Sequence, residues 1–272
     1  MKRNMKRNVF VMAACMLGLN LSVLANDLIV AENGAGGAHS TITDALAAAA
    51  DGDRIFVNPK AGDGAYAENI TIEKSIQLLS GKEGVKFTMQ GNIVVTPEVA
   101  RRITIIGMKD LQGGISSSIK SPDGTRTKIE LLNCEFLSGV VNFDVDNFDV
   151  TVASSIVNGR ILIKYGKIIG NQVSNTISCN CININSDASV TNDTIQIIGN
   201  KITMNYYTAL PINDNFGIYW NSNSNYFNIS NNYVNFEYGY YCPWNCQSYG
   251  YGIFVNNAKN SNNGRNQIVK NT

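Results

Sequence analysis

The chain has 272 residues, of which 44% are hydrophobic and 16% are charged, and its formal net charge is +1. So small a charge argues against a nucleic-acid binder, which needs a strongly basic surface to neutralise phosphates. The length suits one large domain or one solenoid.

The first 25 residues have the pattern of a secretory signal peptide. Four basic residues precede an apolar segment, and Val23-Leu24-Ala25 supplies the small-residue pattern that signal peptidase reads. We therefore predict cleavage before Asn26 and a mature domain, residues 26–272, that is secreted, periplasmic or held at the cell surface. The apolar segment falls short of the ~20 residues of a membrane span, so no span is expected. A lipoprotein site at Cys15 is the alternative reading.

One helix is predicted near the mature N-terminus, over residues 40–50. Ser40 can cap it, and the alanine-rich segment that follows favours a helix. After Asp51-Gly52-Asp53 the helical periodicity ends, and short β-branched segments follow, at Arg54–Asn58, Asn69–Ile72, Ser75–Leu79, Gly91–Val95 and Arg102–Ile106. Short strands at even spacing without helices between them indicate an all-β domain.

A recurring phrase, two or three apolar residues followed by Gly or Asn, sets the period of these strands. It occurs at Ile105–Gly107, Leu131–Cys134, Ile168–Asn171 and Ile197–Asn200, with weaker copies at Ile229–Asn232 and Ile268–Asn271. The spacing is that of β-helix coils with loops inserted on one side. Asn at a coil corner tolerates a left-handed backbone and can bond to the next Asn in a ladder. We therefore predict a right-handed parallel β-helix, in which stacking buries what one coil cannot bury alone.

The segment from Ser40 to Phe87 resembles the first coils of the pectin-lyase-like superfamily. The similar features are a Thr-Ile-x-x-Ala-Leu helix followed by Gly52–Val57, Gly64–Ile72 and Lys74–Leu79. The resemblance implies a β-helix whose helix caps one end of the solenoid, and a polysaccharide as the partner. It does not define the chemistry, because this fold hosts lyases, esterases, hydrolases and non-catalytic proteins.

The esterase branch of this superfamily is a poor match. Asn133-Cys134-Glu135-Phe136 resembles the Asn-Cys-Arg-Phe segment of pectin methylesterases, but Ser138-Gly139-Val140-Val141 follows where that family has Gly-Tyr-Gln-Asp. Ile161–Gly166 stands where the family has Val-Asp-Phe-Ile-Phe-Gly, and it contains no carboxylate. Pectin methylesterase activity, which needs two carboxylates, is therefore not expected.

A second set contains the residue types expected in the active site of a calcium-dependent uronate lyase, an enzyme that acts by β-elimination. Strand alternation in Phe143–Asp149 predicts that Asp144 and Asp146 face outward, where their carboxylates could hold Ca²⁺. Arg160 and Lys164 follow and are the candidate catalytic bases. The alternative is that this outward strand face is simply polar.

Aromatic residues are concentrated near the C-terminus. Ten of the twelve tyrosines and both tryptophans lie between 206 and 251. Aromatic rings stack on sugars, and the candidate carbohydrate-binding residues are Tyr219, Trp220, Tyr238, Tyr240, Tyr241 and Trp244. We also expect a disulfide between Cys242 and Cys246, which would hold this loop ready for a ligand. The alternative is that these aromatic residues pack inside the coils and cover the C-terminal end.

The other mature cysteines are Cys134, Cys179 and Cys181, and either of the last two could pair with Cys134. Since the mature chain has an odd number of cysteines, at least one thiol stays free and is expected inside the core. Residues 267–272 read like the start of another coil, so the open C-terminal coil is a candidate surface for self-association.

The sequence favours an exported β-helix that binds polysaccharide, and it leaves open whether the protein is an enzyme. The calcium-dependent polysaccharide lyase is one alternative. The other is a structural or adhesive surface protein whose Asn-rich ladders mediate protein contacts.

Overall fold

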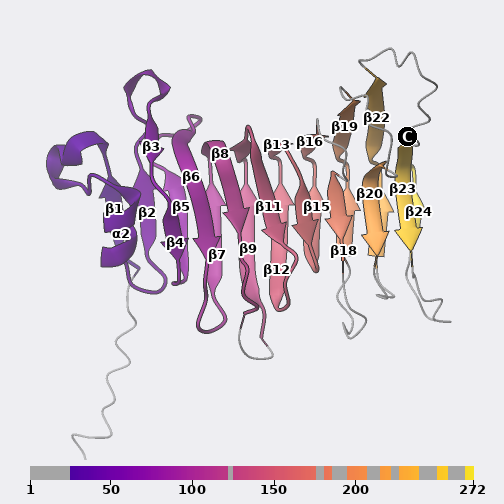
Figure 1. Ribbon diagram of the computed structural model, residues 1–272. Helices are drawn as coiled ribbons and strands as arrows, with labels where there is room; N and C mark the ends of the chain where they lie inside the picture. Colours follow the sequence, from indigo (N-terminus) through magenta and orange to yellow (C-terminus); the bar gives the residue numbers. More distant parts are fainter. Residues whose placement is uncertain are drawn as a thin grey trace, which may run out of the picture.

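The protein is a parallel β-helix, as predicted from the period of the recurring phrase. The computed structural model describes residues 25–121, 125–175, 181–185, 195–206, 215–221, 227–238, 250–256 and 267–272. The coils stack into an elongated solenoid that begins beside helix α2 (Ile42–Ala48) and ends at β23 (Gly250–Asn256) and β24 (Gln267–Val269) (Figure 1). In the described part of the chain, no helix is both long and apolar enough to cross a membrane.

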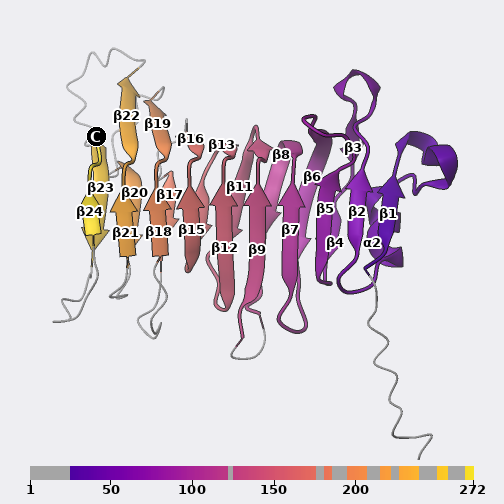
Figure 2. The same cartoon turned by 180° about the vertical axis from the view of Figure 1, so that it is seen from behind.

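One side of the solenoid is a ten-stranded parallel sheet, whose strands lie side by side along its length (Figure 2). Its strands before β24 are β1 (Asp27–Val30), β2 (Arg54–Val57), β5 (Ile76–Ser80), β7 (Arg102–Ile106), β9 (Thr127–Leu132), β12 (Phe148–Ala153), β15 (Gly166–Ile169), β18 (Ile195–Ile198) and β21 (Phe227–Ser230). Two short 3-10 helices, Glu32–Gly37 and Ala61–Asp63, lie in the first connections.

The other side is a fourteen-stranded parallel sheet. Twelve of its strands form two series, called the first and second arm here, and each arm receives one strand from a coil. The first arm contains β3 (Ala65–Ala67), β10 (Glu135–Phe136), β13 (Ile156–Asn158), β16 (Gln172–Asn175), β19 (Lys201–Tyr206) and β22 (Tyr233–Tyr238). The second arm contains β4 (Ile70–Ile72), β11 (Gly139–Phe143), β14 (Ile161–Ile163), β17 (Ile182–Ile184), β20 (Asn215–Asn221) and β23. The long strands β6 (Phe87–Val95) and β8 (Met108–Ser116) pass through both arms and join them.

The core is built from rows of inward side chains, one from each coil. In the ten-stranded sheet, the first apolar residue of the recurring phrase stacks on the same position of the next coil, and all of these residues are fully buried: Ile105, Leu131, Val152, Ile168, Ile197 and Ile229. Stacking therefore buries side chains that one isolated coil would leave exposed.

An asparagine ladder lines the corner between the ten-stranded sheet and the first arm, and this confirms the prediction. The backbone N–H and Nδ2 of Asn171 both donate to Oδ1 of Asn200 at 3.0 Å. Asn200 donates in the same way to Asn232, at 3.0 and 2.9 Å, and Asn232 donates to Asn271 at 3.0 Å. Each Nδ2 also reaches a carbonyl of the preceding coil, as from Asn200 to Ile168 at 2.9 Å. The ladder thus satisfies buried polar groups in successive coils.

Helix α2 is shorter than predicted and has a different cap. Thr41, not Ser40, is the N-cap, and its Oγ1 accepts the N–H of Asp44 at 3.0 Å. The helix spans Ile42–Ala48 and ends because Ala49 is extended, with φ −66° and ψ 146°. Two adjacent hydroxyl residues can both cap a helix, which is why the sequence misplaced its start by one residue.

Two charged side chains of the following coil hold both ends of helix α2. The Glu68 carboxylate accepts the N–H groups of Ile42 and Thr43, each at 2.9 Å. The Lys74 ammonium donates to three carbonyl oxygens at the C-terminal end, the nearest being that of Ala49 at 2.6 Å. A carboxylate at the N-terminus and a cation at the C-terminus complement the helix dipole, so the short helix is fastened over the end of the solenoid.

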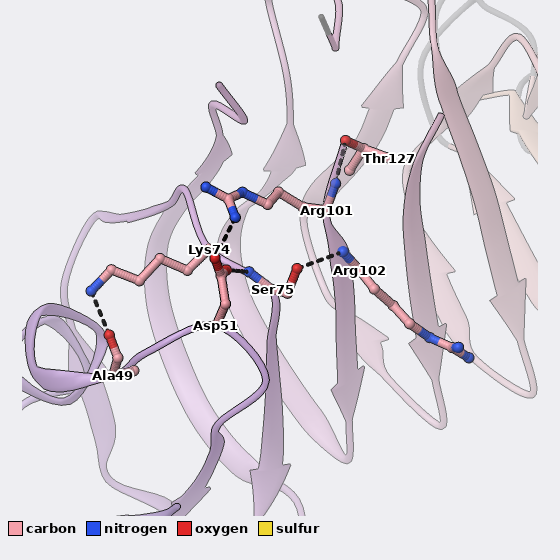
Figure 3. A network of polar contacts seen from close by, with 7 residues as sticks. All are labelled: Ala49, Asp51, Lys74, Ser75, Arg101, Arg102 and Thr127. Carbon is pink, nitrogen blue, oxygen red and sulfur yellow. Dashed lines mark hydrogen bonds and ion pairs between the residues drawn. The ribbon is translucent and has the colours of Figure 1, made fainter. Parts of the chain in front are cut away.

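A polar network extends from this cap over the next coils (Figure 3). Asp51 accepts the N–H of Ser75 at 2.7 Å and forms an ion pair with Arg101. Ser75 Oγ in turn accepts the N–H of Arg102 at 3.2 Å. Because these residues precede or begin strands of consecutive coils, the network fixes how the first coils stack, which gives its basic side chains a structural role.

Candidate functional site

A polar cleft of about 500 Å³ opens at the corner between the two arms, in the coils next to helix α2. Its volume lies within the range of about 300–1,000 Å³ that is usual for ligand sites. Three successive coils form it, through the β3–β4 connection and the middle parts of β6 and β8, and it is lined by Ala67, Glu68, Asn69, Gln90, Gly91, Asn92, Gln112 and Gly113.

Two glycines shape the floor of this cleft. Gly91 and Gly113 have φ values of +145° and +127°, which L side chains rarely adopt. A Cβ on Gly113 would lie 2.4 Å from the carbonyl oxygen of Gly91, so only glycine permits this approach between the coils. The two strands therefore bend through the corner and leave their flanking polar side chains at the surface.

Four carboxamides provide most of the cleft's hydrogen-bonding groups. Asn69, Gln90, Asn92 and Gln112 are all exposed. Asn69 Oδ1 accepts the backbone N–H of Asn92 at 2.8 Å and its Nδ2 at 3.4 Å, which holds these two side chains together. Glu68 is half-buried and bonded to helix α2. No Lys or Arg is among the lining residues, so the cleft offers neutral donors and acceptors with one carboxylate at its edge.

A buried carboxylate supports the corner from inside. Asp110 is fully buried, and its Oδ2 accepts the N–H of Gly114 at 2.6 Å while its Oδ1 accepts that of Gln112 at 3.3 Å. Burial raises the pKa of Asp110 above its ordinary value, although the two backbone N–H groups oppose this shift.

Replacement of Asp110 by Asn should make stability less dependent on pH. Because the pKa is raised in the folded protein, the wild type is most stable relative to the variant below pH 3.8, where Asp110 is protonated in both states. It then loses stability, by up to about 1.4 kcal/mol per pH unit, as the pH rises through the folded pKa. Urea unfolding of Asp110→Asn and wild type from about pH 3 to about pH 7 checks this, with Asp63→Asn, at an exposed site, as the control. Parallel stability curves for wild type and Asp110→Asn would contradict it.

Asp144 and Asp146, the two predicted calcium ligands, do not occupy strand positions, so their predicted placement on one strand face was wrong. Strand β11 ends at Phe143, and Asp144 and Asp146 lie in the turn before β12. Asn147, with φ 64°, turns the backbone there and breaks the expected alternation.

Each of these carboxylates contacts a side chain of the protein. Asp146 Oδ1 accepts from Lys164 Nζ at 2.9 Å, so its charge is balanced by a cation of the protein. Asp144 Oδ2 lies 3.4 Å from Nδ2 of Asn185. Ca²⁺ takes about six to eight oxygen ligands, and the described part of the chain contains no group of three His, Cys, Asp or Glu residues placed to hold a metal ion.

The two candidate bases lie apart. Arg160 and Lys164 flank opposite ends of β14 (Ile161–Ile163), and four residues of extended chain span about 13 Å. Arg160 lies instead next to the row of the second arm that contains Asn92 of the cleft. The register runs from Asn92 through Gly114 to Val140, and the N–H of Val141 donates to the Arg160 carbonyl at 2.9 Å. The outer face of the second arm therefore continues from the cleft toward Arg160.

Two of the predicted sugar-binding aromatic residues, Trp220 and Tyr219, face opposite sides of strand β20. Trp220 is fully buried and packs against Phe227, with ring centroids 4.6 Å apart, so its assignment to sugar binding was wrong. Alternation in β20 turns Trp220 inward and Tyr219 outward. The Tyr219 ring is parallel to that of Phe254 in the next coil, at 5.6 Å and 3°, and Phe216 packs beside it at 5.0 Å. Tyr219 thus belongs to an aromatic cluster on the second arm.

The other predicted residues of the aromatic region lie outside the described part of the chain. Tyr238 contributes backbone to β22, but its side chain is not described, and Tyr240, Tyr241, Trp244 and the pair Cys242 and Cys246 are not described at all. The predicted signal peptide also lies there, apart from Ala25.

Cys134 is a buried free thiol, as expected for at least one cysteine. Cys181 is also buried, and the two form no disulfide with each other. Burial raises the pKa of Cys134 to about 11, so its reactive thiolate form is scarce at neutral pH. Cys134 therefore serves as a small core residue.

No protein-family model matches the chain, and no curated protein or solved structure matches it either. The functional argument therefore rests on the fold and on the residues of the site. The sequence did not predict the carboxamides of the cleft. The signal that could have located them is glycine within strand segments, at Gly91 and Gly113, which marks a bend or a close backbone approach.

Proposed function

We propose that this is an exported β-helix protein, related to the pectin-lyase-like superfamily, that binds polysaccharide at the cleft between the arms. One observation carries the proposal: an open cleft of about 500 Å³ lined by four carboxamide side chains. The signal-peptide pattern of the first 25 residues supports export.

The chemistry of the cleft suits sugar hydroxyl groups. Each carboxamide both donates and accepts hydrogen bonds, as a hydroxyl group does. The glycine floor, Gly91 and Gly113, lets a ligand approach the backbone closely. Beyond the cleft the outer face of the second arm offers an extended surface with Arg160 along it and Tyr219 toward its C-terminal end, so a long polymer could make contacts at several coils.

The charges of the cleft favour a neutral polysaccharide over an acidic one. Its lining residues include Glu68 and no basic side chain, and a carboxylate repels the carboxylates of a uronate polymer. Lyase chemistry is not part of this proposal, since Lys164 is paired with Asp146 and Arg160 lies at the other end of β14.

Gln90→Ala and Gln112→Ala should each weaken polysaccharide binding. Loss of one hydrogen bond to a ligand costs roughly 1.4 kcal/mol, or about tenfold in affinity. Affinity electrophoresis of the purified protein in gels that contain neutral polymers (xylan, β-glucan, mannan) or acidic ones (pectate, alginate) measures this, followed by calorimetry with oligosaccharides of the polymer that retards it. Gln172→Ala, an exposed glutamine of β16 in the first arm, is the matched control. Equal retention of the wild type and the cleft variants, or no retention of the folded protein by any polymer, would overturn the proposal.

A further inference from the structure

Each clear copy of the recurring phrase has consecutive apolar residues, but only one of two neighbouring residues can point into the core. Alternation along a strand sends only every second side chain inward. The first residue of each phrase is buried, but the second, as in Ile106, Leu132, Ile169 and Ile198, faces outward and stays partly exposed. The solenoid core does not explain why these positions are apolar.

The strand register joins these outward residues into one straight row across the ten-stranded sheet. We call this row the apolar stripe, and its members, nine of them apolar, are Ile29, Phe56, Leu79, Ile106, Leu132, Ala153, Ile169, Ile198, Ser230 and Val269. Its ends are the most open, with Ile29 48% and Val269 45% exposed, whereas Ser230 is only 5% exposed. Since the strands lie side by side along the solenoid, the stripe runs its whole length (Figure 2).

The stripe is accessible along one edge. From β7 onward, only one or two residues connect each described strand of the ten-stranded sheet to the first arm, as Gly170 and Asn171 do between β15 and β16. Connections this short do not rise over the sheet, so no long loop covers the stripe from that edge.

The polar row beside the stripe does not oppose contact with a like surface. Arg54 is paired with Asp27 at 2.7 Å, and Arg102 with Glu130 at 3.2 Å. The charged residues of that row are Asp27, Arg54, Glu130 and Lys167, whose charges sum to zero, so two such faces can meet without strong net repulsion.

We propose that the apolar stripe is the interface between two copies of this chain, which pack with their ten-stranded sheets face to face. Ten strands about 4.8 Å apart form a face about 43 Å long, and strands of about five residues make it about 16 Å wide. The two faces together present about 1,400 Å², within the range of about 1,200–2,000 Å² that stable interfaces bury. A straight row also matches its own copy under a two-fold axis, and stacked sheets pack about 10 Å apart.

Leu132→Lys, near the middle of the stripe, should convert the dimer to a monomer, because it places a charge in an apolar interface. Light scattering coupled to size-exclusion chromatography, with sedimentation equilibrium, should give twice the monomer mass for the wild type and a dissociation constant raised at least about 100-fold for the variant. Leu162→Lys, an outward leucine on β14 of the second arm, is the matched control and should stay dimeric. Circular dichroism and thermal melting establish that both variants fold.

Three outcomes would overturn the proposal. The first is a wild type with the monomer mass at about 100 μM. The second is a dimer that Leu132→Lys leaves intact, whatever the effect of Leu162→Lys. The third is a monomeric wild type that binds lipid vesicles or an insoluble polymer through Leu132, which would give the stripe a different occupant. Because polysaccharide retention is measured separately, failure of the dimer leaves the binding proposal untouched.

Discussion

Asn200→Ala should destabilise the protein by about 4 kcal/mol, a large part of the 5–15 kcal/mol that holds a typical domain folded. Asn200 is buried in the middle of the ladder, and its Oδ1 is the acceptor for both the backbone N–H and Nδ2 of Asn171. Its Nδ2 donates to Ile168 and to Asn232. Removal of the side chain takes these bonds from the buried backbone N–H of Asn171 and from the carbonyl of Ile168, and each unsatisfied group costs roughly 1–3 kcal/mol.

Urea unfolding monitored by circular dichroism measures this loss. The matched control is Asn228→Ala in β21, the strand paired with β18 in the next coil. Asn228 Oδ1 has no hydrogen-bond partner in the described part of the chain, so its removal should cost less than about 0.5 kcal/mol. Equal losses in the two variants would show that the ladder contributes no more than an isolated amide.

The ladder and the coil period were predictable from the sequence because each depends on a local rule repeated in every coil. A residue with positive φ followed by Asn fixes the corner, and Asn171, Asn200, Asn232 and Asn271 all follow two or three apolar residues or a weaker copy of them. The core rows follow from the same pattern, since stacking of identical coils brings equivalent positions together.

The site was not predictable in the same way, because its residues meet only through the register between coils. Asn69, Asn92 and Gln112 lie on three different strands or connections, and no local pattern marks them as neighbours. The clustering of aromatic residues led to the wrong prediction that Trp220 binds sugar. Clustering does not distinguish the inward from the outward positions of a strand. Alternation with Ile218, which is also buried, gives the correct side for Trp220.

Gly113→Ala should be among the most destabilising single substitutions, at about 4 kcal/mol or more. The added Cβ would lie 2.4 Å from the carbonyl oxygen and 2.6 Å from the carbonyl carbon of Gly91, and neither backbone atom can rotate away as a side chain could. The φ of +127° adds strain for any L residue. The strands β6 and β8 would have to separate at the corner, where Gln90 and Gln112 face the cleft, so the variant should also lose polysaccharide retention.

Gly170→Ala separates the two causes of this effect. Gly170 also has a positive φ, +64°, but a Cβ there would meet nothing within 4 Å, and Asn133, Ser154 and Lys270 adopt similar angles at the equivalent corners of other coils. A left-handed alanine costs roughly 1–2 kcal/mol, so chemical denaturation should show a loss of that size for Gly170→Ala and a loss at least twice as large for Gly113→Ala. If the two losses are equal, backbone strain alone accounts for both. The close approach of the coils would then not be what requires glycine at the floor of the cleft.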